Sequence, residues 1–294
     1  MILVAGGTGR LGSLLVPLLR ARGLEVRVLT REPAHAAHLR AEGVTVVQGD
    51  VRDPASLGPA TAGAATVVSA VHGFAGTGGV SPRNVDYEGN LNLIRAAEAA
   101  GAQHLVMVSV VGGPDHPIEL MRMKYRAEQA LQRSRLAWTI IRATGFMELW
   151  AGMIGAPLLE KGKTTVFGRG DNPINFVSVH DVARFVELAV VDPALRGKVL
   201  EVGGPEDISF NQIVALFREH AGAQGSAGHV PLPMMRALSV LIRPLKPDLA
   251  RQIRAGVVMD TADMRFDARP TRTRYQEVPV TTMQEVIRRD YAPR

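Results

Sequence analysis

The stretch VAGGTGRLG, residues 4–12, decides the fold of this 294-residue chain. It follows the apolar run Ile2–Ala5 and opens a segment whose leucines repeat at helical spacing. Gly6, Gly9 and Gly12 stand where the chain turns from strand to helix, and their missing side chains let backbone N–H groups approach a pyrophosphate. The position of the motif within a strand–helix–strand unit predicts a dinucleotide site. The alternative is a tight turn that holds no ligand.

The first two-thirds of the chain alternates short apolar runs with helical patterns. Strands this apolar, separated by helices, form a parallel sheet that is covered on both faces. The sequence therefore predicts a doubly wound, Rossmann-like α/β domain. The further expected strands are residues 26–29, 44–47, 66–71, 105–109, 138–142 and 199–202, and the expected helices include residues 90–100 and 121–132.

The pattern changes after Gly145, and residues 231–260 are helical, rich in Met, Leu and Pro, and without a clear strand. These late segments predict a smaller, mainly helical lobe that serves as the substrate or capping lobe. The predicted dinucleotide-binding domain comprises residues 1–150 and 174–204, and the predicted lobe comprises residues 151–173 and 205–294.

The composition is that of an ordinary globular chain, with 46% hydrophobic and 21% charged residues. The absence of cysteine excludes disulfides, thiol nucleophiles and thiolate metal sites, and we expect no metal. No apolar run approaches the roughly 20 residues of a membrane span, so we expect no membrane partner. Met1 runs straight into a strand without room for a signal peptide, which predicts a cytoplasmic protein. The net charge of +6 comes from scattered arginines, which favours a phosphorylated small ligand over nucleic acid.

The residues after the second strand select the cofactor. An acidic residue at this position hydrogen-bonds the ribose 2′-OH of NAD, whereas an arginine accommodates the 2′-phosphate of NADP. Arg31 therefore favours NADP(H), with Arg10 as a second cation. If Glu32 turns inward instead, NAD(H) is possible, and a purely surface role for Arg31 is the remaining alternative.

Other residues at strand ends complete the predicted cofactor site. Asp50 follows the third strand, where its carboxylate can accept a hydrogen bond from the adenine amino group. His72 follows the fourth strand and is either an acid at the pocket edge or an ordinary loop histidine. The predicted cofactor-binding set also includes Thr8, Leu11, Val51, Ala70 and Val71.

Nine segments of the chain resemble the short-chain dehydrogenase/reductase superfamily, in its atypical NmrA-like branch. The resemblance covers about the first 210 residues, including GGTGRLG, VRVLTR, QGDVRDPASL, VDYEGNLNLIRAA, HLVMVSVVG, KYRAEQAL, WTIIRATGF, NFVSVHDVARF and KVLEVGGPE. It implies a hydride-transfer site made of a serine after the fifth strand and a Tyr-x-x-x-Lys pair on the next helix.

Only part of that catalytic pattern is present. Ser109 fits the serine and Lys124 fits the lysine, but Leu120 stands where the tyrosine belongs. Tyr125 cannot substitute, because neighbouring helical residues point about 100° apart. The alternative for Ser109 is a structural role, in which its hydroxyl hydrogen-bonds nearby backbone groups at the end of the strand. The alternative for Lys124 is an ordinary lysine on the helix surface.

The resemblance also implies nicotinamide contacts from the segment after the sixth strand. Thr144, Gly145 and Phe146 fall at these positions, although Ala143 replaces the usual proline of the pattern. Together with His72, the pocket wall is predicted to contain Phe146, Met147 and Trp150, which are also candidates for the core.

Because the tyrosine that usually donates the proton is missing, the site favours an acceptor whose anion needs hydrogen-bond stabilisation more than immediate protonation. The resulting hypothesis is an NADPH-dependent oxidoreductase that reduces an apolar quinone or conjugated carbonyl. The alternative is a non-catalytic, NADP-binding redox sensor of the NmrA type that acts through a protein partner. Sugar-nucleotide epimerase or dehydratase chemistry is disfavoured, because those reactions usually use the tyrosine as base.

Overall fold

The computed structural model describes residues 1–74, 76 and 79–292. The chain forms two compact units. The first comprises Met1–Arg142 and Val182–Glu201, and the second comprises Ala143–Asp181 and Val202–Arg294. The domain boundaries expected from the sequence, at residues 150, 174 and 204, stay a prediction.

A seven-stranded sheet in the order β10-β6-β5-β4-β1-β2-β3 forms the centre of the first unit. Strand β1 pairs in parallel with β2 on one side and with β4 on the other, and β2–β3 and β4–β5 are also parallel. The strand order therefore reverses at β1, where sheets of this kind bind their ligands. The strands are β1 (Ile2–Ala5), β2 (Val26–Thr30), β3 (Thr45–Gln48), β4 (Thr66–Ser69), β5 (His104–Val110), β6 (Ala137–Ala143) and β10 (Lys198–Val202).

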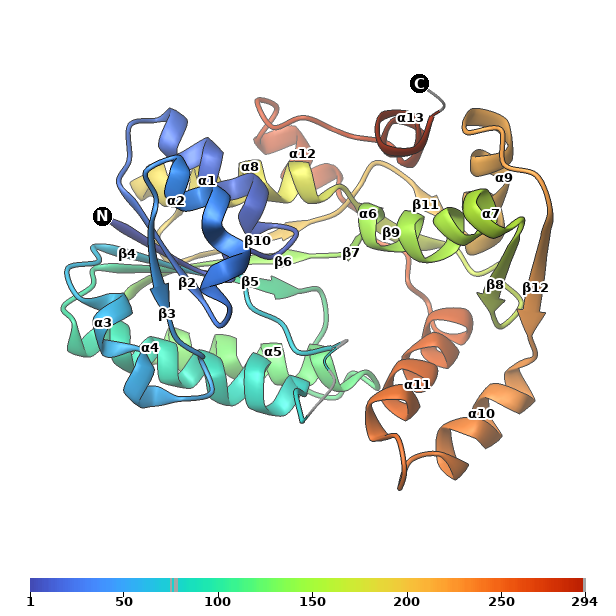
Figure 1. The fold of residues 1–294 in the computed structure, drawn as a ribbon, viewed down its shortest axis with the longest axis horizontal. Coiled ribbons are helices and arrows are strands. Elements are labelled where there is room, and N and C mark those ends of the chain that lie inside the picture. The colour runs from blue at the N-terminus through green and yellow to red at the C-terminus, as the bar shows by residue number, and fades with distance from the viewer. Residues whose placement is uncertain (75, 77–78, 293–294) are drawn as a thin grey trace. The chain divides into compact units, whose positions relative to one another are not determined.

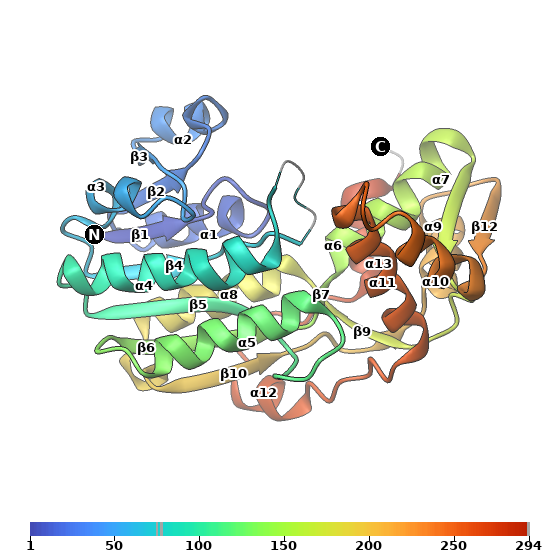
Figure 2. The same cartoon turned by 90° about the horizontal axis from the view of Figure 1, so that it is seen from below.

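Helices cover both faces of this sheet, as expected for apolar parallel strands. Figure 1 shows α1 and α8 on one face and α3, α4 and α5 on the other. Helices α4 and α5 lie side by side in Figure 2 and pack against each other. The bounds are α1 (Gly12–Ala21), α2 (Ala37–Ala41), α3 (Gly58–Thr61), α4 (Asn90–Ala99), α5 (Glu119–Gln132) and α8 (Val179–Val191), with the short helix η3 (Pro82–Gly89) leading into α4.

The structure confirms the predicted Rossmann-like fold class. Each predicted strand of the large sheet is present, and its bounds differ from the prediction by no more than two residues. Pro17 lies inside α1, which continues through it to Ala21.

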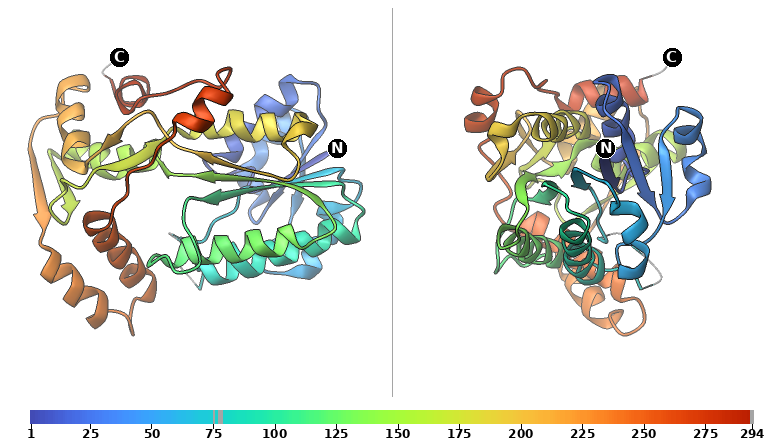
Figure 3. Two further views of the ribbon diagram at one scale, coloured as in Figure 1. Left: turned by 180° about the vertical axis from the view of Figure 1, so that it is seen from behind. Right: turned by 90° about the vertical axis from the view of Figure 1, so that its left-hand side faces the viewer.

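The second unit contains helices and two small sheets. Helices α10 (Leu232–Leu241) and α11 (Pro247–Thr261) form the expected helical region, and Figure 3 shows them side by side. The sequence did not predict its five short strands, which form the sheets β11-β9-β7 and β12-β8. The other elements are β7 (Gly145–Phe146), α6 (Met147–Trp150), η4 (Ala151–Gly155), α7 (Ala156–Lys161), β8 (Lys163–Phe167), β9 (Ile174–Val177), β11 (Asp207–Ile208), α9 (Phe210–His220), β12 (Ser226–Val230), α12 (Arg269–Arg274) and α13 (Met283–Tyr291).

The helices are of modest length, with 15 residues in α11 and 14 in α5. Within the part of the chain that the structure describes, no helix has both the length and the apolar character needed to cross a membrane.

A buried histidine lies in the core of the large sheet. The ring Nε2 of His104 lies 3.0 Å from Thr139 Oγ1, and that hydroxyl donates to the Leu195 carbonyl at 2.9 Å. Because the hydroxyl hydrogen is used on Leu195, Nε2 must carry the hydrogen of the first contact. Burial, aided by the charge of Arg196, lowers the pKa of His104 from 6.5 to about 4. The imidazole is therefore neutral at pH 7.

We expect this histidine to make the fold sensitive to acid. As the pH falls from 6.5 to about 4, the unfolded chain binds a proton here that the folded chain does not. The free energy of unfolding should therefore fall by up to about 3 kcal/mol, and the effect should be absent above pH 6.5. Urea titrations at several pH values test this, with His104→Gln as a non-titrating donor. An equally steep pH dependence in that variant would contradict the assignment.

Candidate functional site

The parallel strands bring the predicted cofactor residues to one edge of the sheet. In the register of the pairs, Ala5 is opposite both Leu29 and Ser69, and Thr30 is opposite Gln48. The residues that follow these strands therefore emerge together. They are the glycine loop after β1, Arg31 after β2, Asp50 after β3, and Ala70, Val71 and His72 after β4.

The glycine loop is built on close backbone approaches. Gly6 has a φ of +88°, and a Cβ there would lie 2.6 Å from the Ala70 carbonyl oxygen. A Cβ on Gly12 would lie 2.2 Å from the Gly6 carbonyl oxygen. Gly9 is exposed, and a Cβ there would meet only the Gly6 carbonyl oxygen, at 3.2 Å. The turn itself requires Gly6 and Gly12, whereas Gly9 presents an open backbone surface.

The N-terminus of α1 offers free donors. Leu11, at the N-cap position, is buried and provides no capping side chain. The N–H groups of Arg10, Leu11 and Gly12 donate to no described residue. Free N–H groups at a helix N-terminus, together with the helix dipole, form a site for an anion such as a pyrophosphate.

The cations predicted to bind the ribose phosphate are accessible. Arg31 and Arg10 are exposed, and neither forms an ion pair with a described residue. Glu32 does not turn inward but points to His35, with 3.1 Å between Oε2 and Nδ1. Thr8 Oγ1 lies 3.4 Å from Thr30 Oγ1 at the end of β2. This arrangement leaves arginine, and not glutamate, available to the ribose.

Asp50 already has a strong partner in this structure. Its carboxylate accepts hydrogen bonds from Arg52 Nη2 at 2.6 Å and from Arg52 Nε at 3.0 Å. Burial on its own raises the pKa of Asp50, but the Arg52 hydrogen bonds and the charges of Arg52 and Arg31 hold it below the usual value. The neighbouring Val51 is buried, and its carbonyl accepts from Asn92 Nδ2 at 2.9 Å. An adenine contact to Asp50 would therefore have to share the carboxylate with Arg52.

Lys124 lies buried in the first unit and connects three of its segments. Its Nζ donates to the Val71 carbonyl at 2.7 Å and to the Val108 carbonyl at 3.0 Å. The same Nζ lies 3.2 Å from Asp86 Oδ1, and the two side chains are 4% and 0% exposed. This third contact is an ion pair without hydrogen-bond alignment, because Oδ1 accepts no hydrogen bond from any described residue. Lys124 is therefore not the surface lysine of the alternative interpretation.

Asp86 is a residue that the sequence interpretation missed. It lies in η3, and its second oxygen accepts the Gly73 N–H at 2.9 Å. It thus fixes both Lys124 and the loop that follows β4. Asp86 lies in the VDYEG segment of the resemblance, but sequence periodicity gives no sign that it meets a cation 38 positions away.

His72 lies in the electrostatic field of the same cluster. His72 is exposed, yet desolvation by the surrounding protein lowers its pKa, and the charges of Lys124 and Arg10 lower it further against the opposing effect of Asp86. At neutral pH the ring is therefore uncharged and has one N–H to donate.

Ser109 is turned to a different partner from the one the resemblance implies. Its hydroxyl donates to Glu128 Oε1, and the residue is 1% exposed. Arg142 Nη2 holds the other oxygen of Glu128 at 2.7 Å, and Arg142 Nη1 reaches Glu201 at 3.0 Å. The structure therefore places Ser109 in a hydrogen-bonded network between β5, α5 and β6, and its catalytic role stays a prediction.

The first turn of α5 has a leucine where the catalytic pattern has its tyrosine. Leu120 is half-buried and lies one helical turn before Lys124, on the same side of the helix. Tyr125 is half-buried on a different side, as the angle between neighbouring helical residues requires.

The other predicted site residues belong to the second unit. Thr144 N donates to the Val202 carbonyl at 3.0 Å, and Thr144 Oγ1 to Asn175 Oδ1 at 3.2 Å. Gly145 and Phe146 form β7, which pairs with β9. Met147 is 0% exposed and packs in the core, so it does not line an open pocket. Trp150 is half-buried with its ring centroid 4.9 Å from that of Phe210.

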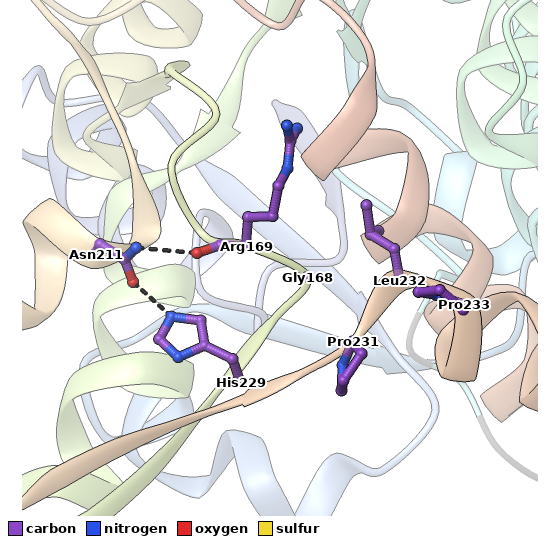
Figure 4. Close-up of a pocket in the computed structure, with 7 residues that line it drawn as sticks. All are labelled: Gly168, Arg169, Asn211, His229, Pro231, Leu232 and Pro233. Carbon is purple, nitrogen blue, oxygen red and sulfur yellow. Dashed lines mark hydrogen bonds between the residues drawn. The ribbon is translucent and has the colours of Figure 1, made fainter.

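Two open pockets are lined by the second unit alone, and neither contains a predicted site residue. One, of about 560 Å³, is shown in Figure 4, where Asn211 bridges the Arg169 carbonyl and His229. The other, of about 690 Å³, is lined by aspartates and arginines that mostly pair with each other, such as Asp263 with Arg265.

This chain matches a family model, several relatives in sequence and several solved structures. A family model described as NAD(P)H-binding matches residues 6–193. The photosystem II assembly factor Ycf39 of Synechocystis sp. is 32% identical over 82% of this chain and 74% of its own length. The NAD(P)H azoreductase of Xenophilus azovorans is 32% identical over 76% of this chain and 74% of its own length.

Quinone reductases of Escherichia coli match both in sequence and in fold. Quinone oxidoreductase 2 is 26% identical over 76% of this chain and 76% of its own length. The crystal structure of an NADPH-dependent quinone oxidoreductase in complex with NADPH has a TM-score of 0.78 and 24% identity, covering 98% of both chains. This structural likeness shows a shared fold.

Proposed function

This chain belongs to the NAD(P)H-binding family, and from that premise we propose that it is an NADPH-dependent oxidoreductase acting on an apolar quinone or conjugated carbonyl. The observation that carries the proposal is the contrast within the first unit. The dinucleotide edge has its glycine turn, together with N–H groups and arginines that have no partner among the described residues, whereas Leu120 occupies the position of the usual proton donor.

The residues that would hold the cofactor follow from this geometry. The free N–H groups of Arg10, Leu11 and Gly12 suit the pyrophosphate, and Arg31 and Arg10 suit the 2′-phosphate. Lys124 gives two of its three hydrogens to carbonyl groups, so one remains for a ribose hydroxyl. NADPH, when bound, supplies the hydride.

The missing tyrosine restricts the acceptor. Reduction of a simple ketone creates an alkoxide, a strong base that requires a positioned acid. Hydride addition to a quinone or conjugated carbonyl gives a delocalised anion, which needs hydrogen-bond stabilisation more than immediate protonation. In our proposal, His72 donates its N–H to that anion and water completes protonation. Ser109 has no direct contact with substrate, because its hydroxyl is held by Glu128.

The names of two relatives agree with this choice of acceptor. An azoreductase and a quinone oxidoreductase are both named for the reduction of conjugated groups. The photosystem II assembly factor is named for assembly and not for a reaction. It is the kind of relative that the alternative, a non-catalytic NADP-binding protein with a protein partner, would have. We place the reductase in the cytoplasm, with a small apolar molecule as its substrate.

Steady-state turnover separates the two functions. We expect the protein to oxidise NADPH when a panel of soluble quinones is added, with His72→Ala slower and His72→Gln partly active because its amide still donates. His38→Ala removes an exposed histidine of helix α2 outside the proposed contacts and is the control. Tight NADPH binding without turnover on any quinone would support the non-catalytic alternative instead.

We predict that Arg31 sets the preference for NADPH over NADH. Arg31→Ala should weaken NADPH binding by about 10- to 100-fold, the loss of charge-assisted hydrogen bonds, and leave NADH binding unchanged. Fluorescence titration of both cofactors measures this. Arg40→Ala removes an exposed arginine that lies within helix α2 rather than at a strand end, and it should change neither affinity. Equal affinity of the wild type for the two cofactors would overturn the assignment.

A further inference from the structure

Helix α10 and the turn after it expose an unusual number of large apolar side chains. Leu241 is 73% and Leu245 85% exposed, and Met234 and Leu238 are exposed on the same side of the helix. Met234, Leu238 and Leu241 are spaced by four and three residues, which is the spacing of one helical face. The helix ends at Leu241, and Leu245 lies in the following turn, in which Leu245 N and Lys246 N donate to the Ile242 carbonyl.

This exposed face is not the side that packs α10 into the unit. Met235 and Ser239 are buried on the other side, and the Met235 Cε would lie 3.0 Å from a Cβ placed on Gly256 of α11. The helix therefore has one apolar side that is used in packing and a second that faces solvent. Contiguous exposed apolar residues of this kind mark an interaction surface.

Two cations, Arg243 and Lys246, lie beside the C-terminal end of this face. Both are exposed, and neither forms an ion pair with a described residue, whereas Arg236 lies on the opposite side of the helix. No aspartate or glutamate occurs in the sequence between Glu219 and Asp248. An apolar face flanked by unpaired cations is complementary to an anionic lipid surface, into which such a helix inserts its leucines.

We propose that the α10 surface, defined as Met234, Leu238, Leu241 and Leu245 with Arg243 and Lys246, docks the protein on an anionic membrane. A second copy of the chain fits this surface less well, because a two-fold interface would bring the same unpaired cations against each other. The docking is peripheral and differs from the spanning segment that the sequence excludes. It departs from the expectation of no membrane partner that we drew from the sequence, and it does not depend on the proposed reaction.

Vesicle co-sedimentation tests this surface directly. The full-length protein should pellet with vesicles of phosphatidylglycerol and phosphatidylcholine in equal parts, and far less with phosphatidylcholine alone. Leu241→Ser/Leu245→Ser should weaken binding by about 10-fold or more, and Arg243→Gln/Lys246→Gln by about 10- to 30-fold. Val199→Ser/Val280→Ser removes two exposed valines elsewhere and should bind like the wild type.

Two results would overturn the proposal. One is a wild type that does not pellet with the anionic vesicles, or that pellets no better than the leucine variant. The other is a wild-type dimer, measured by analytical ultracentrifugation, that the leucine variant dissociates, which would assign the surface to a second copy. Retained NADPH binding by each variant shows that it is folded.

Discussion

Replacing Lys124 with methionine is expected to lower the free energy of unfolding by about 3–5 kcal/mol. The ammonium is 4% exposed and lies 3.2 Å from the Asp86 carboxylate, which is fully buried. Removing the cation leaves a buried charge without compensation and frees the Val71 and Val108 carbonyls. The cost comes mainly from the stranded carboxylate and not from the pair itself.

A double-mutant cycle in urea isolates this pair. Lys124→Met combined with Asp86→Asn should be less destabilised than the sum of the two single variants, with a coupling energy of about 1–3 kcal/mol. Lys198→Met makes the same substitution at an exposed position of the first unit and should change stability by less than about 0.5 kcal/mol. Strict additivity of the two buried substitutions would show that Lys124 and Asp86 do not act as a unit.

Replacing Gly9 with alanine is expected to reduce NADPH affinity by about 100-fold or more with little change in stability. The added methyl group would stand on the open surface of the glycine loop and keep the pyrophosphate from the free N–H groups. The loss corresponds to about two hydrogen bonds to a charged group. We expect the fold to accept the change with a small backbone shift, because the new Cβ meets only the Gly6 carbonyl oxygen, at 3.2 Å.

Isothermal titration with NADPH, paired with thermal unfolding, measures both parts of this prediction. Gly58→Ala is the matched control, since a Cβ there meets nothing within 4 Å and lies in helix α3. By contrast, Gly12→Ala should destabilise the protein itself, because its Cβ would lie 2.2 Å from the Gly6 carbonyl oxygen. NADPH affinity that is unchanged in Gly9→Ala would place the pyrophosphate elsewhere.

The fold of the first unit could be predicted because its signals are local. Apolar runs such as Ile2–Ala5 and the glycine turn after it contain the information for a buried parallel strand and its crossover. The strands of the second unit carry no such signal. Strand β12 (Ser226–Val230) is short and largely exposed, and its partner β8 lies about 60 positions earlier in the chain. Only tertiary contact makes it a strand.

The sequence could predict which positions along the chain form the candidate site, but not which partners their side chains contact. The positions of Arg31 and Lys124 followed from strand ends and from a motif. The partners of these side chains did not, because they depend on contacts between distant segments. Ser109 is held by Glu128, and Asp86 reaches Lys124 from a different helix. Sequence patterns place a residue on an element but do not show which buried group it meets.

Anaerobic single turnover tests the central claim most directly. Protein loaded with one equivalent of NADPH is mixed with a soluble quinone, and the near-ultraviolet absorbance of the reduced nicotinamide is followed. We predict that the bound NADPH is oxidised much faster than free NADPH, and that Gly9→Ala, which does not hold the cofactor, gives only the free rate. Bound NADPH that remains reduced with every quinone tested would contradict the assignment as an oxidoreductase.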